Sequence, residues 1–143
     1  MRVLTVAATA IVALSGVAPA SADPGAAGAS AASYPPPFVD HVLWTQWNQL
    51  PSLRVYPTPS GRAAAKTLGS VGPDAEEAWS EVLALAPDAG TPGMREQFLC
   101  HWELAEVLEP GKTSWNLEPW RPVVDDTTMV GSGCNPGGSE ERF

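Results

Sequence analysis

The first apolar segment of the chain is continuous, whereas the later ones are periodic. Residues 3–17 are Val, Leu, Ala and Ile interrupted only by Thr, Ser and Gly, and Arg2 supplies one positive charge before them. Ala20-Ser21-Ala22 then places small residues where a signal peptidase reads them. The apolar run is shorter than the about 20 residues that cross a bilayer. Residues 1–22 are therefore predicted to be a cleavable secretory signal, with an uncleaved N-terminal anchor as the alternative.

Two short segments rich in β-forming residues open the remainder of the chain. Residues 38–47 contain β-branched and aromatic side chains at high density, and residues 53–56 repeat that composition. Leu50-Pro51-Ser52 lies between the two and favours a turn. We expect an N-terminal β-hairpin that ends at Pro57 and Pro59.

Helical periodicity follows the hairpin. Asp74 and Glu77 have the spacing of an acidic capping box at the start of residues 74–86. The apolar residues of that segment fall on one helix face: Ala75, Trp79, Val82, Leu83 and Ala86. Ser60 could cap a short helix over residues 63–68, and Asp125 or Asp126 could cap one helical turn within residues 123–130.

Residues 91–108 fit two patterns. Thr91-Pro92 suits a helix start, and Met94, Phe98, Trp102 and Ala105 then form an apolar stripe. Residues 97–104 also alternate as a strand would. Segment length and the cap favour the helix. In that helix Gln97 and His101 point into the apolar side, while Arg95, Glu103 and Glu106 point outward.

The segment of residues 115–122 contains two prolines, which forbid a helix and predict extended chain. Together the segments indicate a small α+β single domain over residues 38–137, with an N-terminal hairpin, two to three helices and one disulfide. Residues 23–37 are rich in Ala, Gly, Ser and Pro and are expected to form a flexible linker. Residues 138–143 are expected to be a disordered tail.

The formal net charge of −8 narrows the possible partners. Nucleic acid binding requires clustered Lys and Arg, which the chain lacks. Adhesion to anionic lipid by charge is disfavoured for the same reason. Since no later segment is apolar enough to cross a bilayer, no membrane insertion is expected after signal cleavage.

Cys100 and Cys134 are the only cysteines. Outside the cytoplasm such a pair is most simply a disulfide. The alternative is a nucleophilic Cys100 activated by His101. Adjacent helical residues point about 100° apart, so the two side chains are poorly placed for that pairing.

Six tryptophans are many for a domain of this size. They could fill a core that is short of aliphatic residues, or they could stack on sugar rings or apolar partners. Trp44 and Trp47 lie on opposite faces of a strand. Trp115 and Trp120 lie in the Pro-rich extended segment, where exposure is more frequent, and are the binding candidates. Arg62 and Arg121 could receive an anionic group, or Arg121 could simply pair with Glu118.

His101 is the best candidate for acid–base chemistry. Glu118 or Glu103 could supply its carboxylate partner. The simpler interpretation is a core histidine with a satisfied hydrogen bond. No nucleophile motif, phosphate loop or metal-ligand spacing occurs, so we expect no metal and no cofactor.

Four segments together resemble a known family. They are residues 53–58 (LRVYPT) with Gly61-Arg62, residues 97–101 (QFLCH), residues 115–122 (WNLEPWRP) and residues 134–136 (CNP). In that order they resemble the DUF2599 family of small exported actinobacterial proteins, over about residues 42–137. The resemblance implies export and the disulfide, and it implies no catalytic residue.

These observations lead to two functional hypotheses. The first is a non-catalytic binding or interaction module, secreted or associated with the cell wall, whose partner is an envelope polymer or a protein. The alternative is a small secreted hydrolase that uses His101 with a carboxylate. A polar cleft containing His101 would favour the enzyme, and a shallow Trp-lined surface with His101 buried would favour the binding module.

Overall fold

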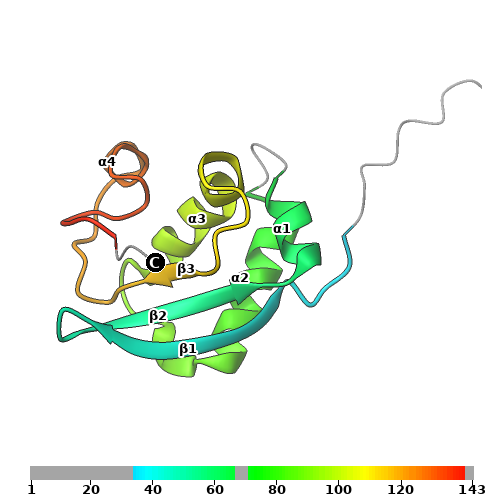
Figure 1. Cartoon of the computed structure of the whole chain (residues 1–143), viewed down its shortest axis with the longest axis horizontal. Coiled ribbons are helices and arrows are strands. Elements are labelled where there is room, and N and C mark those ends of the chain that lie inside the picture. The colour runs from blue at the N-terminus through cyan, green and yellow to red at the C-terminus, as the bar shows by residue number, and fades with distance from the viewer. Residues whose placement is uncertain (1–33, 67–70, 141–143) are drawn as a thin grey trace, which may run out of the picture. The chain divides into compact units, whose positions relative to one another are not determined.

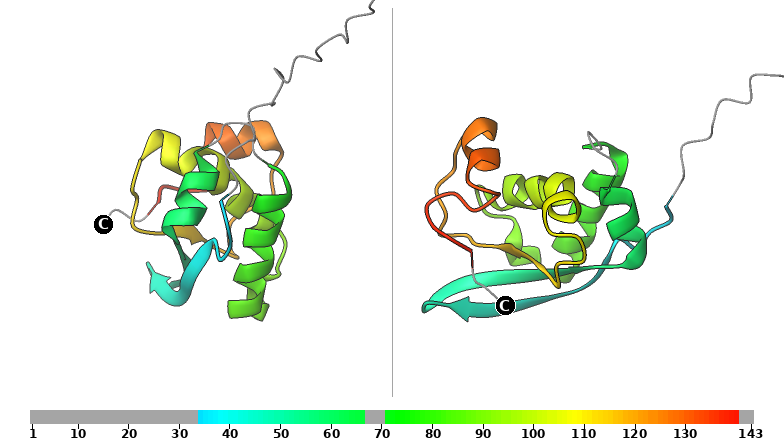
Figure 2. Two further views of the ribbon diagram at one scale, coloured as in Figure 1. Left: turned by 90° about the vertical axis from the view of Figure 1, so that its right-hand side faces the viewer. Right: turned by 45° about the horizontal axis from the view of Figure 1, so that its top comes forward.

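The computed structural model describes residues 34–66 and 71–140. It contains a three-stranded antiparallel sheet of order β1-β2-β3 and four α-helices. The helices lie on one face of the sheet, as both views in Figure 2 and the view in Figure 1 show. The expected α+β class is confirmed. The proposed signal segment, residues 23–33 of the linker and residues 141–143 lie outside the described residues.

Strands β1 (Val39–Trp47) and β2 (Leu50–Pro57) form the expected hairpin. The turn is at Asn48-Gln49, where both residues have positive φ angles of 51° and 66°. Asn is favoured at such left-handed positions in two-residue hairpin turns. The turn expected at residues 50–52 is therefore wrong. Pro51 is tolerated inside β2 because β3 (Trp115–Leu117) pairs only with Leu53–Val55, further along that strand.

Helices α1 (Pro59–Ala65) and α2 (Pro73–Leu85) both begin at a proline. Proline suits the first helical position because its missing N–H would have no partner there. The expected caps are wrong for this reason. Thr58, not Ser60, caps α1 by accepting a 2.9 Å hydrogen bond from Gly61 N, and Gly72 precedes α2, which leaves Asp74 inside its first turn.

Helix α3 (Met94–Leu108) confirms the helical interpretation of residues 97–104. It begins after Gly93, whose φ is 85°, so Thr91-Pro92 lies before the helix rather than at its cap. The expected apolar stripe is buried in the core. Gln97 and His101 point inward as expected, but Glu106 is also buried, which corrects the outward orientation expected for it.

The last part of the domain is attached to α3 by the disulfide. Cys100 and Cys134 are bonded, with their Cα atoms 5.5 Å apart, which confirms the expected pairing. Helix α4 (Asp126–Gly131) lies between them in sequence, and its cap is Asp125, whose Oδ1 accepts from Thr128 N at 2.7 Å. A single 3₁₀ turn, η1 (Pro87–Ala89), follows α2.

Both ends of the described domain are held by specific contacts. In the linker, Pro35 O accepts a hydrogen bond from Ser60 Oγ at 2.5 Å, and Pro37 O accepts one from Thr58 Oγ1 at 2.7 Å. In the tail, Gly138 O accepts from Arg121 at 2.8 Å, and Glu140 forms an ion pair with Lys112. Residues 138–140 are therefore attached to the domain through Arg121 and Lys112. The disorder expected for residues 138–143 stays a prediction.

Candidate functional site

His101 lies inside the protein. Its side chain faces β3 from α3, the residue is only 3% exposed, and its Nε2 donates a 3.1 Å hydrogen bond to Asn116 O. Burial lowers the pKa of His101 from 6.5 to about 3, and the positive charges of Lys112 and Arg121 contribute in the same direction. The imidazole is therefore neutral at physiological pH. Its hydrogen-bond partner is this backbone carbonyl and not Glu118 or Glu103, the two carboxylates that the sequence suggested.

Gln97 binds the extended segment after β3 as a neighbouring strand would. Its Oε1 accepts from Glu118 N at 2.9 Å, and its Nε2 donates to Glu118 O at 3.0 Å. Both backbone groups of Glu118 are satisfied in this way although no strand lies beside them there. Gln97 and His101, spaced i, i+4 on α3, thus fix consecutive parts of the segment of residues 115–122.

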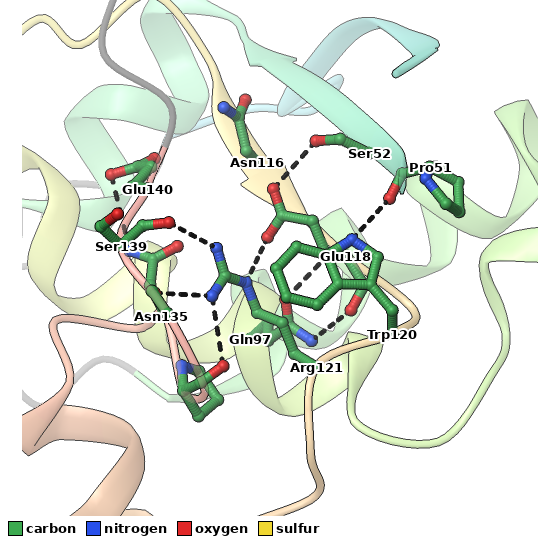
Figure 3. A network of polar contacts seen from close by, with 12 residues as sticks. Pro51, Ser52, Gln97, Asn116, Glu118, Trp120, Arg121, Asn135, Ser139 and Glu140 are labelled. Carbon is green, nitrogen blue, oxygen red and sulfur yellow. Dashed lines mark hydrogen bonds and ion pairs between the residues drawn. The ribbon is translucent and has the colours of Figure 1, made fainter. Parts of the chain in front are cut away.

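Glu118 and Arg121 form a fully buried ion pair (Figure 3). Glu118 Oε2 accepts from Arg121 Nε at 2.5 Å, and Glu118 Oε1 accepts from Ser52 Oγ at 2.9 Å. Arg121 Nη1 also donates to Pro136 O at 3.2 Å and to Gly138 O. Figure 3 shows the guanidinium between the carboxylate and the C-terminal segment. Of the two alternatives for Arg121, the structure contains the ion pair.

Arg62 is also committed to contacts within the domain. It forms an ion pair with the buried Glu106, and its Nη2 donates to Lys112 O at 2.7 Å. Glu106 in turn accepts from Gly111 N at 3.2 Å. Helix α1 is thereby tied to α3 and to the loop before β3.

Glu103 is not brought to His101. It is partly exposed on α3 and lines a groove of about 420 Å³ together with Arg95, Leu99 and residues of α4. The structure therefore places neither of the proposed carboxylates on the imidazole.

A small cavity of about 130 Å³ lies beside His101. Its lining includes Lys112, Glu140 and Cys134. Lys112 pairs with Glu140 and, at 3.0 Å, with Glu109. Burial raises the pKa of the Glu140 carboxyl above its usual value. Cys134 supplies no thiol because it is in the disulfide.

The tryptophans divide between the core and the surface. Trp115 is 0% exposed and packs against Phe98 and Trp102, with ring centroids 6.0 and 6.1 Å away. The expectation that Trp115 is exposed is wrong because the short strand β3 turns it toward the helices. Trp120 is partly exposed, as are Trp44 and Trp47.

Trp120 is fixed near the turn of the hairpin. Its Nε1 donates to Pro51 O at 3.1 Å, and its ring lies 6.4 Å from that of Trp47. The guanidinium of Arg121 lies 4.6 Å from the centre of the Trp120 ring. These contacts attach Trp120 to both strands of the hairpin, to β1 through Trp47 and to β2 through Pro51.

A shallow surface groove of about 480 Å³ lies between the hairpin and η1. Trp44 forms part of its surface, and Trp44 Nε1 donates to Asp88 Oδ1 at 3.1 Å. We call this feature the Trp44 groove. It is lined by Trp44, Thr45, Gln46, Pro51, Asp88, Thr91 and Pro119.

The sequence did not identify Gln46, Asp88 or Thr91 as candidates. They come from three separate segments, and each is a polar residue of a kind that is common on protein surfaces. Trp44 differs in the sequence from the other five tryptophans by no signal that marks a groove. A single sequence carries no signal that would join them.

Two further features of the described residues bear on function. Nowhere in residues 34–66 and 71–140 do three or more His, Cys, Asp or Glu side chains gather in a way that could hold a metal ion. Over the same ranges, no helix has both the length and the apolarity needed to span a bilayer.

A comparison with protein families identifies the family to which the chain belongs. The family model described as "Protein of unknown function (DUF2599)" matches residues 39–137. The chain belongs to the DUF2599 family. The suspected resemblance is thus confirmed, and the matched range contains every element from β1 to α4.

Relatives of this DUF2599 chain occur in mycobacteria. "Uncharacterized protein Rv0477" of Mycobacterium tuberculosis (strain ATCC 25618 / H37Rv) is 58% identical over 146 residues, covering 98% of this chain and 97% of the relative. "Uncharacterized protein ML2452" of Mycobacterium leprae (strain TN) is 51% identical over 104 residues, covering 73% and 83% respectively. No solved structure matches the chain.

Proposed function

We propose that this DUF2599 protein is a non-catalytic binding module of the cell envelope or the extracellular medium, and that the Trp44 groove is its binding surface. The observation that carries the proposal is the groove itself. It is open, it contains a tryptophan, and it is built on a hairpin and a 3₁₀ turn rather than on a long loop. Ligand sites are commonly preformed concave surfaces of about 300–1,000 Å³.

The state of His101 supports binding over hydrolysis. A general base needs a pKa near the working pH and access to the proton that it removes. His101 is buried, donates to a backbone carbonyl, and has a pKa of about 3. Glu118 is committed to Arg121, and Glu103 faces another groove. The hydrolase hypothesis therefore has the weaker support.

The location outside the cytoplasm rests on two independent features. The disulfide suits an oxidising compartment, since cytosolic thiols are kept reduced. Residues 1–22 have the pattern of a secretory signal. Both are consistent with a protein that meets envelope material.

A sedimentation assay tests the proposal. The purified protein is mixed with cell envelope isolated from a mycobacterium and centrifuged, and the bound fraction is measured. We expect the wild-type protein to sediment with the envelope, and the double variant Gln46→Ala/Asp88→Asn to remain in solution.

The matched control is Leu43→Ala. Leu43 is half exposed on β1 and does not line the groove. It should sediment like the wild type. Equal sedimentation of the double variant and the wild type would refute the groove as the binding surface. Release of new soluble fragments from the envelope by wild-type protein, but not by His101→Ala, would support the hydrolase instead.

A further inference from the structure

The chemistry of the Trp44 groove restricts what it can bind. Trp44 is partly buried and packs against the main hydrophobic core, while its Nε1 is held by Asp88. The indole is therefore fixed before any ligand arrives. A fixed aromatic face binds with little loss of side-chain entropy. Its negative π face attracts the weakly positive C–H groups of a saturated ring.

Polar groups surround that aromatic face. Asp88 uses one carboxylate oxygen for Trp44 and, being exposed, keeps acceptor capacity for other donors. Gln46 and Thr91 are exposed and add an amide and a hydroxyl, each of which can donate and accept. A ligand that fits must therefore combine an apolar ring face with hydrogen-bonding groups around its edge.

The charge of the groove excludes anionic ligands. Its lining contains the Asp88 carboxylate and no Lys or Arg. Among the nearer cations, Arg121 is committed to Glu118 and to C-terminal carbonyls. The chain as a whole carries a net charge of −8. A phosphate, uronate or nucleic acid would be repelled here.

The walls of the groove are rigid. Pro51 and Pro119 have fixed φ angles, and the carbonyl of Pro51 is held by Trp120 Nε1. Pro51 lies in a strand, opposite Gln46 in the hairpin register. Rigid walls allow a ligand to bind with little loss of conformational freedom in the protein.

We propose that the Trp44 groove binds a neutral oligosaccharide, with one sugar ring stacked on Trp44 and ring hydroxyls bonded to Asp88 and Gln46. This rests on the proposed binding function and deepens it, because it names the ligand class. Asp88 accepts from hydroxyls, and Gln46 donates to and accepts from the neighbouring sugar. Trp120 is a positioning residue that holds the Pro51 wall.

Isothermal titration calorimetry on the purified protein tests the ligand class. The probes are cellotetraose, tetra-N-acetylchitotetraose and mannotetraose as neutral chains, tetragalacturonate as the anionic chain, and decaproline as a peptide. We expect at least one neutral tetramer to bind, and no measurable binding of tetragalacturonate or decaproline. Gln46→Ala should weaken the neutral interaction by about tenfold, as the loss of one or two hydrogen bonds does.

Two variants separate the roles of charge and fold. Asp88→Asn keeps an oxygen that can accept from Trp44 Nε1 but removes the charge, so neutral binding should weaken while repulsion of tetragalacturonate is reduced. Trp44→Phe retains an aromatic ring with a smaller face and should weaken binding without the cavity that Trp44→Ala would leave. Leu43→Ala should bind as the wild type does. Circular dichroism melting of each variant checks that the fold is intact.

Specific outcomes would overturn the inference. It fails if no neutral tetramer binds, if tetragalacturonate or decaproline binds as tightly, or if Gln46→Ala and Asp88→Asn leave neutral binding unchanged. If envelope sedimentation still depends on Gln46 and Asp88 in any of these cases, the proposed binding function stands and only the sugar assignment falls. If sedimentation is independent of them as well, both fall.

Discussion

At the scale of single residues, the burial of His101 makes the free energy of unfolding depend on pH. Its pKa is 6.5 as a free side chain and about 3 in the folded protein, chiefly because of burial. The unfolded chain therefore binds a proton at a pH where the folded one does not. The stability that this difference contributes is complete above pH 6.5 and is lost between pH 6.5 and pH 3. We expect the free energy of unfolding to fall there by up to about 1.4 kcal/mol per pH unit.

Urea unfolding at pH 7, 6, 5 and 4 measures this effect, with His101→Gln as the reference. Gln can still donate a hydrogen bond but does not titrate. Asp125 and Glu140, whose pKa values are also shifted, are present in both proteins, so their contributions cancel in the difference. The wild-type curve should approach that of the variant as the pH falls. Two parallel curves would mean that His101 titrates alike in the folded and unfolded states.

His101→Ala tests the structural role of the same residue. Removing the imidazole leaves a cavity in the core and the Asn116 carbonyl without this donor. The unsatisfied carbonyl alone costs about 1–3 kcal/mol. For a domain of this size, each kcal/mol lowers the melting temperature by about 4–8 °C. We expect differential scanning calorimetry to show a decrease of several degrees. An unchanged melting temperature would favour a catalytic role, since catalytic histidines at clefts contribute little to stability.

At the scale of elements, α1 is packed so closely on the start of β1 that only glycine fits at one position. A Cβ atom added at Gly61 would lie 2.2 Å from Phe38 O, a backbone atom that cannot move aside by itself. In an exposed helix, Gly→Ala stabilises by about 1 kcal/mol. Here we expect Gly61→Ala to destabilise the protein, lowering the midpoint of chemical unfolding.

Gly131 provides a matched control for this change. It also lies in a helix, α4, and a Cβ there meets nothing within 4 Å. Gly131→Ala should leave the unfolding midpoint unchanged or raise it slightly. The same direction of change in both variants would show that contact with Phe38 does not determine the effect at Gly61.

The disulfide determines how firmly α4 is attached to the rest of the domain. Cys100 lies on α3, Cys134 follows α4, and their sequence separation is 34. Closing a loop of that length stabilises the folded state by about 3–4 kcal/mol in the chain-entropy model. The apolar cluster beneath α4 contains the two cysteines and Met129, so it offers little to replace the covalent bond.

We therefore expect the free energy of unfolding of the double variant Cys100→Ser/Cys134→Ser to be lower than that of the wild type by about 3–4 kcal/mol. In hydrogen exchange, the amides of α4 should lose protection before those of α3. Calorimetry and exchange mass spectrometry measure the two effects. Equal loss of protection in α3 and α4 would show that the disulfide stabilises the domain as a whole rather than its α4 segment.

The elements could be predicted from the sequence to the extent that their signals were local. Residues 97–104 form a helix and not the competing strand, because α3 is 15 residues long and turns its apolar stripe toward the core. The helix starts at Pro59 and Pro73 differ from the expected ones, because Pro59 was expected to end the hairpin and Asp74 was expected to cap the second helix. Residues 115–117 were identified as extended, but their place beside β2 depends on pairing with Leu53–Val55, which no local pattern encodes.

At the scale of the whole molecule, long-range contacts determined which candidates could be accessible. Trp44 and Asp88 are 44 residues apart, and Arg62 and Glu106 are equally far apart. The sequence could propose Arg62, Arg121, Trp115 and Glu118 by residue type. It could not show that ion pairs and core packing occupy them, because burial is a property of the assembled domain.

The same long-range pairing determines the charge that a partner would meet. Four of the basic side chains in the described domain form ion pairs with carboxylates: Arg62 with Glu106, Arg95 with Glu76, Lys112 with Glu140 and Arg121 with Glu118. The surplus of acidic residues is therefore presented at the surface. An acidic surface disfavours adhesion to anionic envelope components by charge, so the proposed binding function requires a local site such as the Trp44 groove.

Export would change the whole chain at its N-terminus and at its cysteines. If residues 1–22 are a cleaved signal, protein recovered from the culture medium of a mycobacterial expression host begins at Asp23. Because thiols are kept reduced in the cytoplasm, the disulfide of an exported chain should form only after export. Exported protein should therefore be both shortened and oxidised. Intact-mass measurement reads the N-terminus, and alkylation without reductant should label neither Cys100 nor Cys134. A mass that retains Met1 would contradict cleavage, and labelling of both cysteines in native secreted protein would contradict the bond.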